Sequence, residues 1–281
     1  FDYTFVLRSS SLNMILSKLI RSKIILGVVP LNSTKNLRNR YKPFKKLINF
    51  FYSYHEIIDC RNNYNLSKNI HMIEHYDRLL SKIPKFKINN DRIHKYSAPD
   101  LIKDKKTITI DSFLSKFEIK NFLIFHFDEK WDLTNYDSNK IIKLTSSISK
   151  EYNGPILITD GLTKNIFNET IKDHLKFEKI DILKNDIQLE QSKEIKNIFY
   201  LTSLDIKSLF YLISLSQIII EPHGALTHIG SVYNKKIIDL VSQGKKNQLL
   251  KWRPISDHGI QVDIEDIESI CKLINKLKLK S

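Results

Sequence analysis

Short apolar runs alternate with amphipathic segments from about residue 122 onward, and this rhythm constrains the fold more than any other feature of the sequence. Five runs have the length and composition of buried strands, namely 122–127, 155–160, 197–202, 217–222 and 236–241. The intervening and following segments have the apolar spacing of helices, namely 137–152, about 165–177, 203–215, 224–234 and 264–279. Strands and helices that alternate in this way predict parallel βαβ units and a doubly wound sheet.

The first third of the chain shows the same alternation less regularly. A strand over 2–7, a helix over about 9–20 and a strand over 23–29 predict one more βαβ unit, and a further helix is expected near 65–83. The polar stretch that follows, Pro84 to Lys106, is typical of a connection between domains. The first third is therefore predicted to hold about half of a Rossmann-like unit.

We expect two α/β domains with Rossmann-like parallel sheets and helices on both faces, because 281 residues exceed the usual size of one domain. The first domain is predicted over 1–110 and the second over 111–281. The sequence begins with Phe1 and enters a strand almost at once. The N-terminal domain is therefore expected to be incomplete.

The chain is strongly basic, with a net charge of +14 and an isoelectric point near 9.5. Such a charge attracts nucleic acid, an anionic membrane surface or phosphorylated substrates. Lys, Ile and Asn are all abundant, as in proteins encoded by A/T-rich genomes, so the charge alone does not decide between these partners.

Cysteine usage and hydropathy point to the cytoplasm. Cys60 and Cys271 lie far apart in the sequence and are expected to be reduced, buried thiols rather than a disulfide or a metal site. No apolar run reaches the roughly 18 residues of a membrane-spanning helix, and the first residues do not resemble a signal peptide. We therefore expect a cytoplasmic protein without a metal ion.

A glycine turn joins the strand predicted over 217–222 to the helix predicted over 224–234. Gly224 allows a close approach of the backbone, and the N–H groups at the start of the following helix favour a phosphate. His223 lies at the helix entry, and His228 projects one turn further along the same face. The same pattern also fits a plain strand–helix corner with a capping histidine, so the turn by itself leaves both interpretations open.

The turn resembles the C-terminal block of glycosyltransferase family 9, the lipopolysaccharide heptosyltransferase group. Members carry D-[TS]-G-x-x-H or P-x-G-G-x-x-H there, and this chain has Pro222-His223-Gly224-Ala225-Leu226-Thr227-His228 followed by an apolar strand. "FHFDEKWDLTNYDSNKIIKLTSSI" and "GPILITDG" resemble the first two strands of the family's donor domain. "FDYTFVLRSSSLNMILSKLIRSKIILGV" resembles part of its acceptor domain, and "YHEIIDCRNNYNL" resembles a helix entry there. Only the block over 218–241 is specific.

The resemblance implies the GT-B fold and inverting, metal-independent transfer of a heptose-like sugar or hexose. The donor would be a nucleotide-sugar, an ADP-sugar first of all, and the acceptor a lipopolysaccharide core, a lipid-linked glycan or another cell-surface glycan. No cofactor is implied. The catalytic base of the family would lie in a segment before Phe1.

The resemblance also implies a set of donor-binding residues: His223, Gly224, Ala225, Leu226, His228, Lys130, Thr134, Asp160, Gly161 and Thr202. Two of these positions depart from the family pattern. His223 stands where most members have Asp, and Thr134 stands where they have a phosphate-binding Lys, for which Lys130 is the nearest substitute. Restoring Asp at 223 is therefore expected to leave donor binding intact or to improve it. From the residues alone, Lys130 beside Trp131 and Asp160 beside Gly161 also fit a solvated charge and a simple turn, and His126 fits a core histidine.

The segment 35–54 interleaves basic and aromatic residues. This pattern suits an anionic membrane surface, a phosphorylated lipid-linked acceptor or single-stranded nucleic acid, and it equally suits a core with solvated lysines. We expect a peripheral location at the inner face of the inner membrane and no nucleic-acid partner. Two alternatives stay open: an enzyme like glycosyltransferase family 61, whose H-G-A-G-L-T-N block "HGALT" resembles, or a non-catalytic basic binding protein of the same fold.

Overall fold

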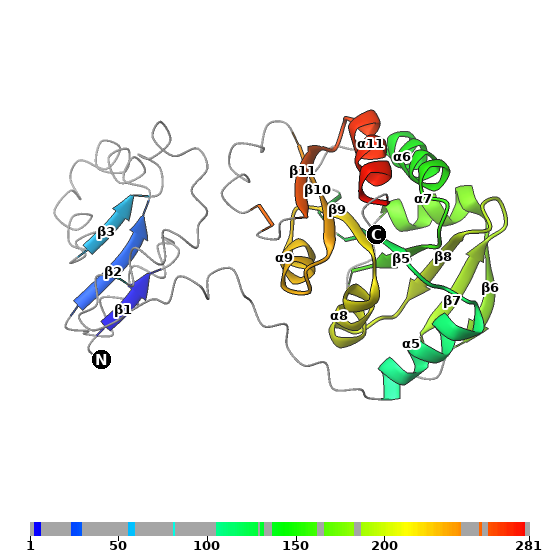
Figure 1. The fold of residues 1–281 in the computed structure, drawn as a ribbon, viewed down its shortest axis with the longest axis horizontal. Coiled ribbons are helices and arrows are strands. Elements are labelled where there is room, and N and C mark those ends of the chain that lie inside the picture. The colour runs from blue at the N-terminus through cyan, green and yellow to red at the C-terminus, as the bar shows by residue number, and fades with distance from the viewer. Residues whose placement is uncertain are drawn as a thin grey trace. The chain divides into compact units, whose positions relative to one another are not determined.

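The computed structural model of the chain describes residues 3–6, 24–29, 56–59, 81, 105–128, 130–131, 137–161, 166–182, 187–242, 253–254 and 258–278. The chain divides into two compact units (Figure 1). Unit 1 comprises Phe1–Tyr96 and Leu250–Trp252, and unit 2 comprises Ser97–Leu249 and Arg253–Ser281. The division expected between residues 110 and 111 falls inside helix α5 (Lys105–Lys116) of unit 2.

Unit 1 contains a three-stranded parallel sheet in the order β1-β2-β3. The strands β1 (Tyr3–Val6) and β2 (Ile24–Val29) confirm the two predicted strands, and Ile25 is buried. β3 (Glu56–Asp59) corrects an expectation, since the family resemblance placed the entry of a helix there. Its two adjacent β-branched residues favour a strand over a helix. The predicted helices over 9–20 and 65–83 and the basic segment 35–54 lie outside the described residues.

Unit 2 is built on an eight-stranded sheet in the order β11-β10-β9-β4-β5-β8-β7-β6. The strands are β4 (Leu123–Phe127), β5 (Ile156–Asp160), β6 (Phe177–Ile182), β7 (Gln188–Ser192), β8 (Ile198–Thr202), β9 (Ile218–Pro222), β10 (Lys236–Val241) and β11 (Gly259–Asp263). All five predicted strands are present, and they pair in parallel with their neighbours from β11 to β8.

The far edge of this sheet departs from the predicted all-parallel arrangement. β7 pairs antiparallel with β8, and β6 pairs antiparallel with β7. Their sequences, FEKIDI and QLEQS, are rich in polar residues and contain none of the continuous apolar runs that mark the central strands. A search for buried strands therefore passes over them, as it passes over the equally polar β11.

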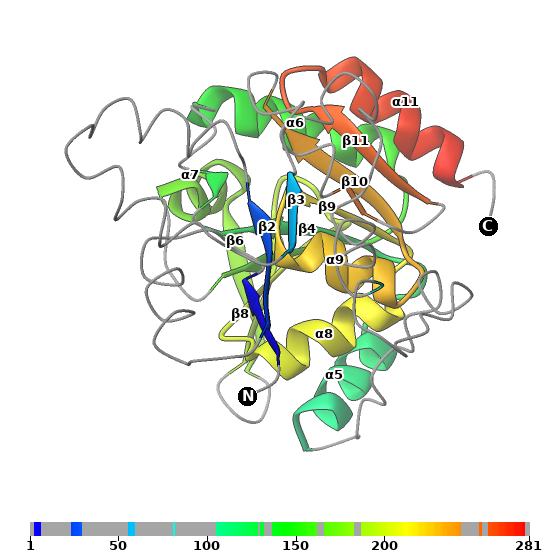
Figure 2. The same cartoon turned by 90° about the vertical axis from the view of Figure 1, so that its left-hand side faces the viewer.

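Helices cover both faces of the sheet, as expected (Figures 1 and 2). α6 (Ser138–Glu151), α7 (Ile166–Leu175) and α11 (Ile267–Lys278) pack on one face, and α5, α8 (Ile206–Leu215) and α9 (Ala225–Val232) pack on the other. Asp137 and Asp205 start α6 and α8 by accepting hydrogen bonds from the backbone N–H groups of Lys140 and Ser208, each at 2.8 Å. No helix of the described residues is long and apolar enough to cross a membrane.

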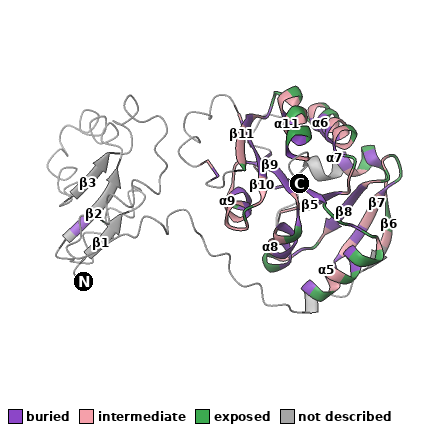
Figure 3. Cartoon of the chain, in the orientation of Figure 1, coloured by how far each residue is buried: buried purple, intermediate pink, exposed green. Residues whose placement is uncertain are grey.

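The core of unit 2 consists of two apolar layers, one on each side of the sheet. The central strands β4 and β9 are buried along their whole length, because helices cover both of their faces (Figure 3). Cys271, on α11, is a half-buried free thiol, whereas a fully buried one was expected.

Candidate functional site

The strand order of the sheet reverses between the parallel neighbours β4 and β9. β4 leads to α6 on one face, whereas its neighbour β9 leads to α9 on the other. The β4–β9 ladder ends at the pair Phe125–Ile220, although each strand continues for two more residues. Open α/β sheets bind ligands at such a switch point, outside the carboxyl ends of the strands. Topology alone therefore places a candidate site at the ends of β4 and β9.

Polar side chains form a row across the sheet at this level, on the face that carries α8 and α9. Register pairs Thr159 of β5 with His126 of β4, and Glu221 of β9 with Asp239 of β10, which pairs in turn with Gln261 of β11. Four of the five are buried, Gln261 being the exception. Buried polar groups are costly. Since four neighbouring strands each bury one at the same level, this end of the sheet is more than a packing surface.

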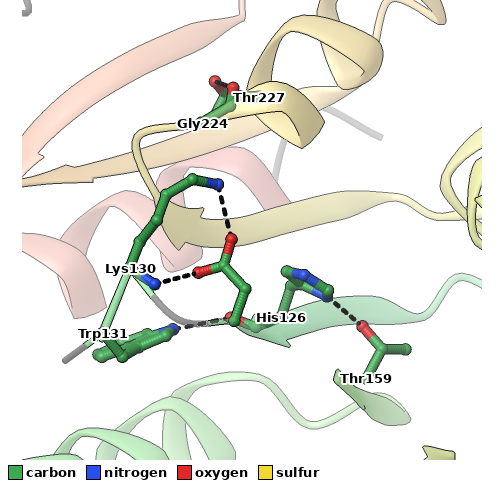
Figure 4. Close-up of polar contacts among 7 residues, drawn as sticks. His126, Lys130, Trp131, Thr159, Gly224 and Thr227 are labelled. Carbon is green, nitrogen blue, oxygen red and sulfur yellow. Dashed lines mark hydrogen bonds and ion pairs between the residues drawn. The ribbon is translucent and has the colours of Figure 1, made fainter. Parts of the chain in front are cut away.

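Lys130 and Asp128, after β4, form an ion pair beside the glycine turn. The ammonium of Lys130 lies 2.6 Å from Asp128 Oδ2, and the Lys130 backbone N–H donates to Asp128 Oδ1 at 3.0 Å. Figure 4 shows the Lys130 side chain reaching from the loop after β4 toward Gly224. The Lys130 side chain is 30 % exposed, so its charge is accessible to a ligand.

Gly224 is the N-cap of α9 and has no side chain with which to cap it. Its φ of −171° and ψ of −161° are extended values that any residue can adopt. The space, not the backbone, requires glycine: an added Cβ would overlap the Lys130 ammonium and lie 2.7 Å from Lys130 Cε. The amides of the first turn of α9 and the Lys130 cation thus meet at one point, which suits an anion. We call Asp128, Lys130, Gly224 and the first turn of α9 the α9 site.

His223 is held beside the α9 site by a buried carboxylate. Its Nδ1 lies 2.8 Å from Oδ2 of Asp239, which is fully buried and also accepts a 2.7 Å hydrogen bond from Gln261 Nε2. The His228 ring packs edge-on against the His223 ring, with 5.5 Å between centroids. When Nδ1 donates to Asp239, the other ring nitrogen of His223 is left as the acceptor, or as a second donor in the cationic form.

Trp131 and His126 are buried next to the loop that carries Lys130. The Trp131 side chain is fully buried, stacks on Phe127 at 4.9 Å, and donates its Nε1–H to the His126 carbonyl at 3.0 Å. His126 Nδ1 lies 2.9 Å from Thr159 Oγ1 (Figure 4). His126 is therefore a buried core histidine, and Trp131 is a packing residue that fixes the loop carrying Lys130.

The structure brings only some of the predicted donor residues together. Lys130, His223, Gly224, Ala225 and His228 gather around the start of α9, with Ala225 exposed as its first residue. Leu226 points into the core between α9 and the sheet, so only its backbone remains for a ligand. Thr134 lies outside the described residues.

The remaining predicted residues belong to neighbouring strands. Gly161 packs against the end of β4: its N–H donates to the Phe127 carbonyl at 2.7 Å, and a Cβ there would lie 3.0 Å from Asp128 Cβ. The Asp160 side chain lies on the other face of the sheet. There the Tyr200 hydroxyl donates to it at 3.4 Å, and burial raises the pKa of its carboxyl. Thr202 ends β8, which β5 separates from β4.

The sequence reasoning missed the carboxylates Asp128, Glu221 and Asp239. Glu221 and Asp239 interrupt the apolar strand sequences IIIEP and KIIDLV, and a charged residue inside a buried strand is a usable signal. Burial raises the pKa of Glu221 well above its ordinary value of 4.5, and the neighbouring charges have smaller effects in both directions. Among the residues that the structure describes, no group of His, Cys, Asp and Glu could hold a metal ion.

Solved structures with the same architecture are glycosyltransferases and nucleotide-sugar enzymes. A glycosyl transferase family 9 protein from Veillonella parvula superimposes with a TM-score of 0.64 at 12% identity, over 100% of this chain and 74% of that one. The fold is that of glycosyltransferase family 9. E. coli heptosyltransferase WaaC with ADP gives a TM-score of 0.55 at 10% identity, over 99% of this chain and 73% of that one. The expected two-domain GT-B type fold is thereby confirmed.

A third structure widens the range of chemistry that the fold supports. UDP-GlcNAc 2-epimerase from Methanocaldococcus jannaschii, in complex with UDP-GlcNAc and UDP, gives a TM-score of 0.50 at 11% identity, over 98% of this chain and 68% of that one. In sequence, no protein-family model matches the chain, and no curated protein is significantly similar to it. The likeness to glycosyltransferase family 9 therefore lies in the fold and in the block over 218–241.

Proposed function

We propose that the protein is a glycosyltransferase that binds a nucleotide-sugar donor at the α9 site. The observation that carries the proposal is the packing of Lys130 against Gly224, which directs a cation and the N-terminus of α9 to one point at the switch point of the sheet. A diphosphate there would accept hydrogen bonds from the α9 amides and from the Lys130 ammonium. Lys130 then has the role of the family's phosphate-binding lysine, whose own position is occupied by Thr134 in this chain.

The reaction that fits this site is inverting transfer without a metal ion. The acceptor hydroxyl attacks the anomeric carbon, the bond from that carbon to the diphosphate breaks, and the bonding electrons move to the phosphate oxygen. Lys130 and the helix N-terminus stabilise the negative charge that develops there, which is the main electrostatic task in such a step. We propose that the base that takes the acceptor proton comes from a segment preceding Phe1.

The donor proposed first is an ADP-sugar carrying a heptose or hexose, in keeping with the bound ADP of the heptosyltransferase of the same fold. The acceptor proposed is a lipopolysaccharide core or another lipid-linked glycan. A peripheral position at the inner face of the inner membrane follows from such an acceptor, and the basic and aromatic segment 35–54 would serve it. Liposome flotation with anionic and neutral vesicles tests this part: equal retention on both would remove the membrane from the proposal.

Calorimetric titration with ADP, UDP and GDP tests donor binding. We expect one of them to bind wild-type protein and Lys130→Ala to lose roughly ten- to hundred-fold in affinity, since a hydrogen bond between charged groups contributes about 1.5–3 kcal/mol. Lys272→Ala is the matched control, because it removes the same charge from an exposed pair with Glu268 on α11. Equal losses in the two variants would reduce the effect to bulk charge.

Product analysis then separates the enzyme classes that share this fold. Incubation with the nucleotide-sugar that binds, with and without a lipopolysaccharide-core acceptor, should release nucleoside diphosphate in an acceptor-dependent manner. Conversion of the sugar to its C2 epimer would assign the epimerase chemistry instead. RNA retention that weakens with salt, without nucleotide binding, would favour a non-catalytic basic binding protein.

A further inference from the structure

Glu221 is a buried carboxyl group just beyond the end of the ladder between β4 and β9. It follows Ile220, the last residue of the β4–β9 ladder, and its side chain lies on the α9 face of the sheet. Its side chain is fully buried, and among the described residues neither carboxyl oxygen accepts a hydrogen bond of ordinary geometry, although the Thr227 backbone N–H is directed toward the carboxyl group. A carboxyl group in this state destabilises a fold that has no use for it, because burial without a partner is costly even for a neutral polar group.

Charged and titratable groups surround Glu221 on every packed element. Asp128 and Lys130 follow β4, which also carries His126, and Asp239 lies opposite Glu221 on β10. From α9, the Thr227 backbone N–H faces the carboxyl group, and His223 and His228 lie at the start of that helix. Burial first, and then the charges of Asp128 and Asp239, raise the pKa of Glu221 against the opposing effects of Lys130 and the Thr227 amide.

The position beneath α9 links this carboxyl group to anion binding. The first-turn amides that would bind a diphosphate belong to the helix turn that Glu221 faces from inside. A protonated Glu221 leaves the positive field of these amides to the ligand. An ionised Glu221 would oppose it, since two like charges about 8–10 Å apart at an effective dielectric constant of about 20 repel by enough to change affinity about ten-fold or more.

We propose that Glu221 is a positioning residue that couples nucleotide binding at the α9 site to a proton, so that the diphosphate binds the form of the protein in which Glu221 is protonated. This inference rests on the proposed function, because it concerns the same site. The proton balance is simple: binding at a pH at which part of the free protein has ionised Glu221 takes up a proton from solvent. The direction is fixed as well, since affinity falls as the pH rises and Glu221 ionises.

The three histidines His126, His223 and His228 would change affinity in the same direction, so the test must separate them from Glu221. ADP affinity is measured by calorimetry from about pH 5.5 to 9, in pairs of buffers with different ionisation enthalpies that report proton uptake. Glu221→Gln, which keeps the shape and cannot ionise, should lose the part of the uptake that Glu221 contributes and bind at least about ten-fold more tightly than wild type at the alkaline end. His223→Asn is the comparison, and it should retain the part of the pH profile that Glu221→Gln removes.

A second measurement uses the ligand-free protein. A carboxyl group whose pKa is raised on folding favours the folded state at low pH and loses this contribution as the pH rises from about 4.5 through the raised pKa. Wild type should therefore lose stability relative to Glu221→Gln with rising pH. Glu221→Met, an apolar variant of similar length, should follow Glu221→Gln and serves if the Gln variant folds poorly.

The outcomes separate this inference from the proposed function. Binding of inorganic pyrophosphate but of no nucleotide, with a pH profile that Glu221→Gln flattens, would reject the nucleotide-sugar proposal and keep the proton coupling. ADP binding with the same pH profile and the same proton uptake in wild type and Glu221→Gln would overturn the coupling and keep the function. Failure of wild type to bind either ligand at any pH would reject both.

Discussion

The ammonium group of Lys130 occupies the space where a side chain on Gly224 would begin. Lys130 follows β4 and Gly224 follows β9, the two strands on either side of the switch point. The extended backbone of Gly224 does not itself require glycine. The absence of a side chain there instead leaves room for the Lys130 ammonium. Gly224 and Lys130 therefore act as one unit at the α9 site.

Gly224→Ala should reduce nucleotide affinity while the protein stays folded. The added methyl group meets only the flexible end of Lys130, which can move away, so the melting temperature should change little. The moved ammonium loses its place beside α9, and we expect affinity for ADP to fall roughly ten-fold. Calorimetry on Gly224→Ala, Lys130→Ala and the double variant checks this. If the two losses add in full, Gly224 contributes independently of Lys130.

His223→Asp should destabilise the protein, although the family pattern suggested that it would be tolerated or improve binding. The new carboxylate would face Asp239, which is fully buried and now lies 2.8 Å from a histidine nitrogen. Two carboxylates in contact at a buried position repel and lose a hydrogen bond, and we expect a loss of about 1–3 kcal/mol in the free energy of unfolding. Urea unfolding measures it.

The control for this substitution is Asp239→Asn in the same background. An amide at 239 removes one of the two charges, so most of the stability lost in His223→Asp should return. His223→Asp that unfolds at the same urea concentration as wild type would show that Asp239 does not depend on the histidine.

The central fold could be predicted because its strands carry continuous apolar sequence. Strands that are buried on both faces have nearly continuous apolar sequences instead of alternating apolar and polar residues. IIIEP and KIIDLV therefore identify β9 and β10, even though each contains one acidic residue. The edge strands β6 and β7 could not be found in that way, because polar residues make up half of FEKIDI and most of QLEQS. Their antiparallel pairing depends on long-range contacts that no local pattern specifies.

The candidate site could be predicted only along one strand–turn–helix segment. His223, Gly224 and His228 are close in sequence, and the family block marks them together. Lys130, nearly a hundred residues earlier, reaches Gly224 only because β4 lies beside β9 in the sheet, and its partner Asp128 follows the same strand. The pairing of His223 with Asp239 depends likewise on the parallel register of β9 and β10, which places Asp239 beside Glu221.

Gly230→Ala should destabilise unit 2 without a direct effect on charge at the site. A Cβ on Gly230 would lie 2.6 Å from Ile219 Cδ1 and 3.2 Å from Ile237 Cδ1, so α9 packs closely on β9 and β10 only with glycine there. Overpacking of this kind costs about 1–3 kcal/mol in the free energy of unfolding. Thermal unfolding measures the loss, and Ile219→Val, which removes the nearest methyl group, should recover part of it. No recovery in the double variant would mean that the helix moves rather than the isoleucine.

Trp131→Phe should weaken nucleotide binding through the position of Lys130. Phenylalanine keeps most of the packing on Phe127 but lacks the N–H that donates to the His126 carbonyl at 3.0 Å. The loss of this buried hydrogen bond should reduce the free energy of unfolding by about 1 kcal/mol.

Because Lys130 precedes Trp131 directly, a looser anchor allows its ammonium to leave Gly224, and affinity for ADP should fall by more than in Tyr152→Phe. That control removes the hydroxyl of a buried aromatic residue, which likewise donates to a backbone carbonyl, that of Asn121 at the opposite end of β4. Paired urea unfolding and ADP titration decide the matter, and equal affinities in the two variants would show that Trp131 stabilises the core without positioning Lys130.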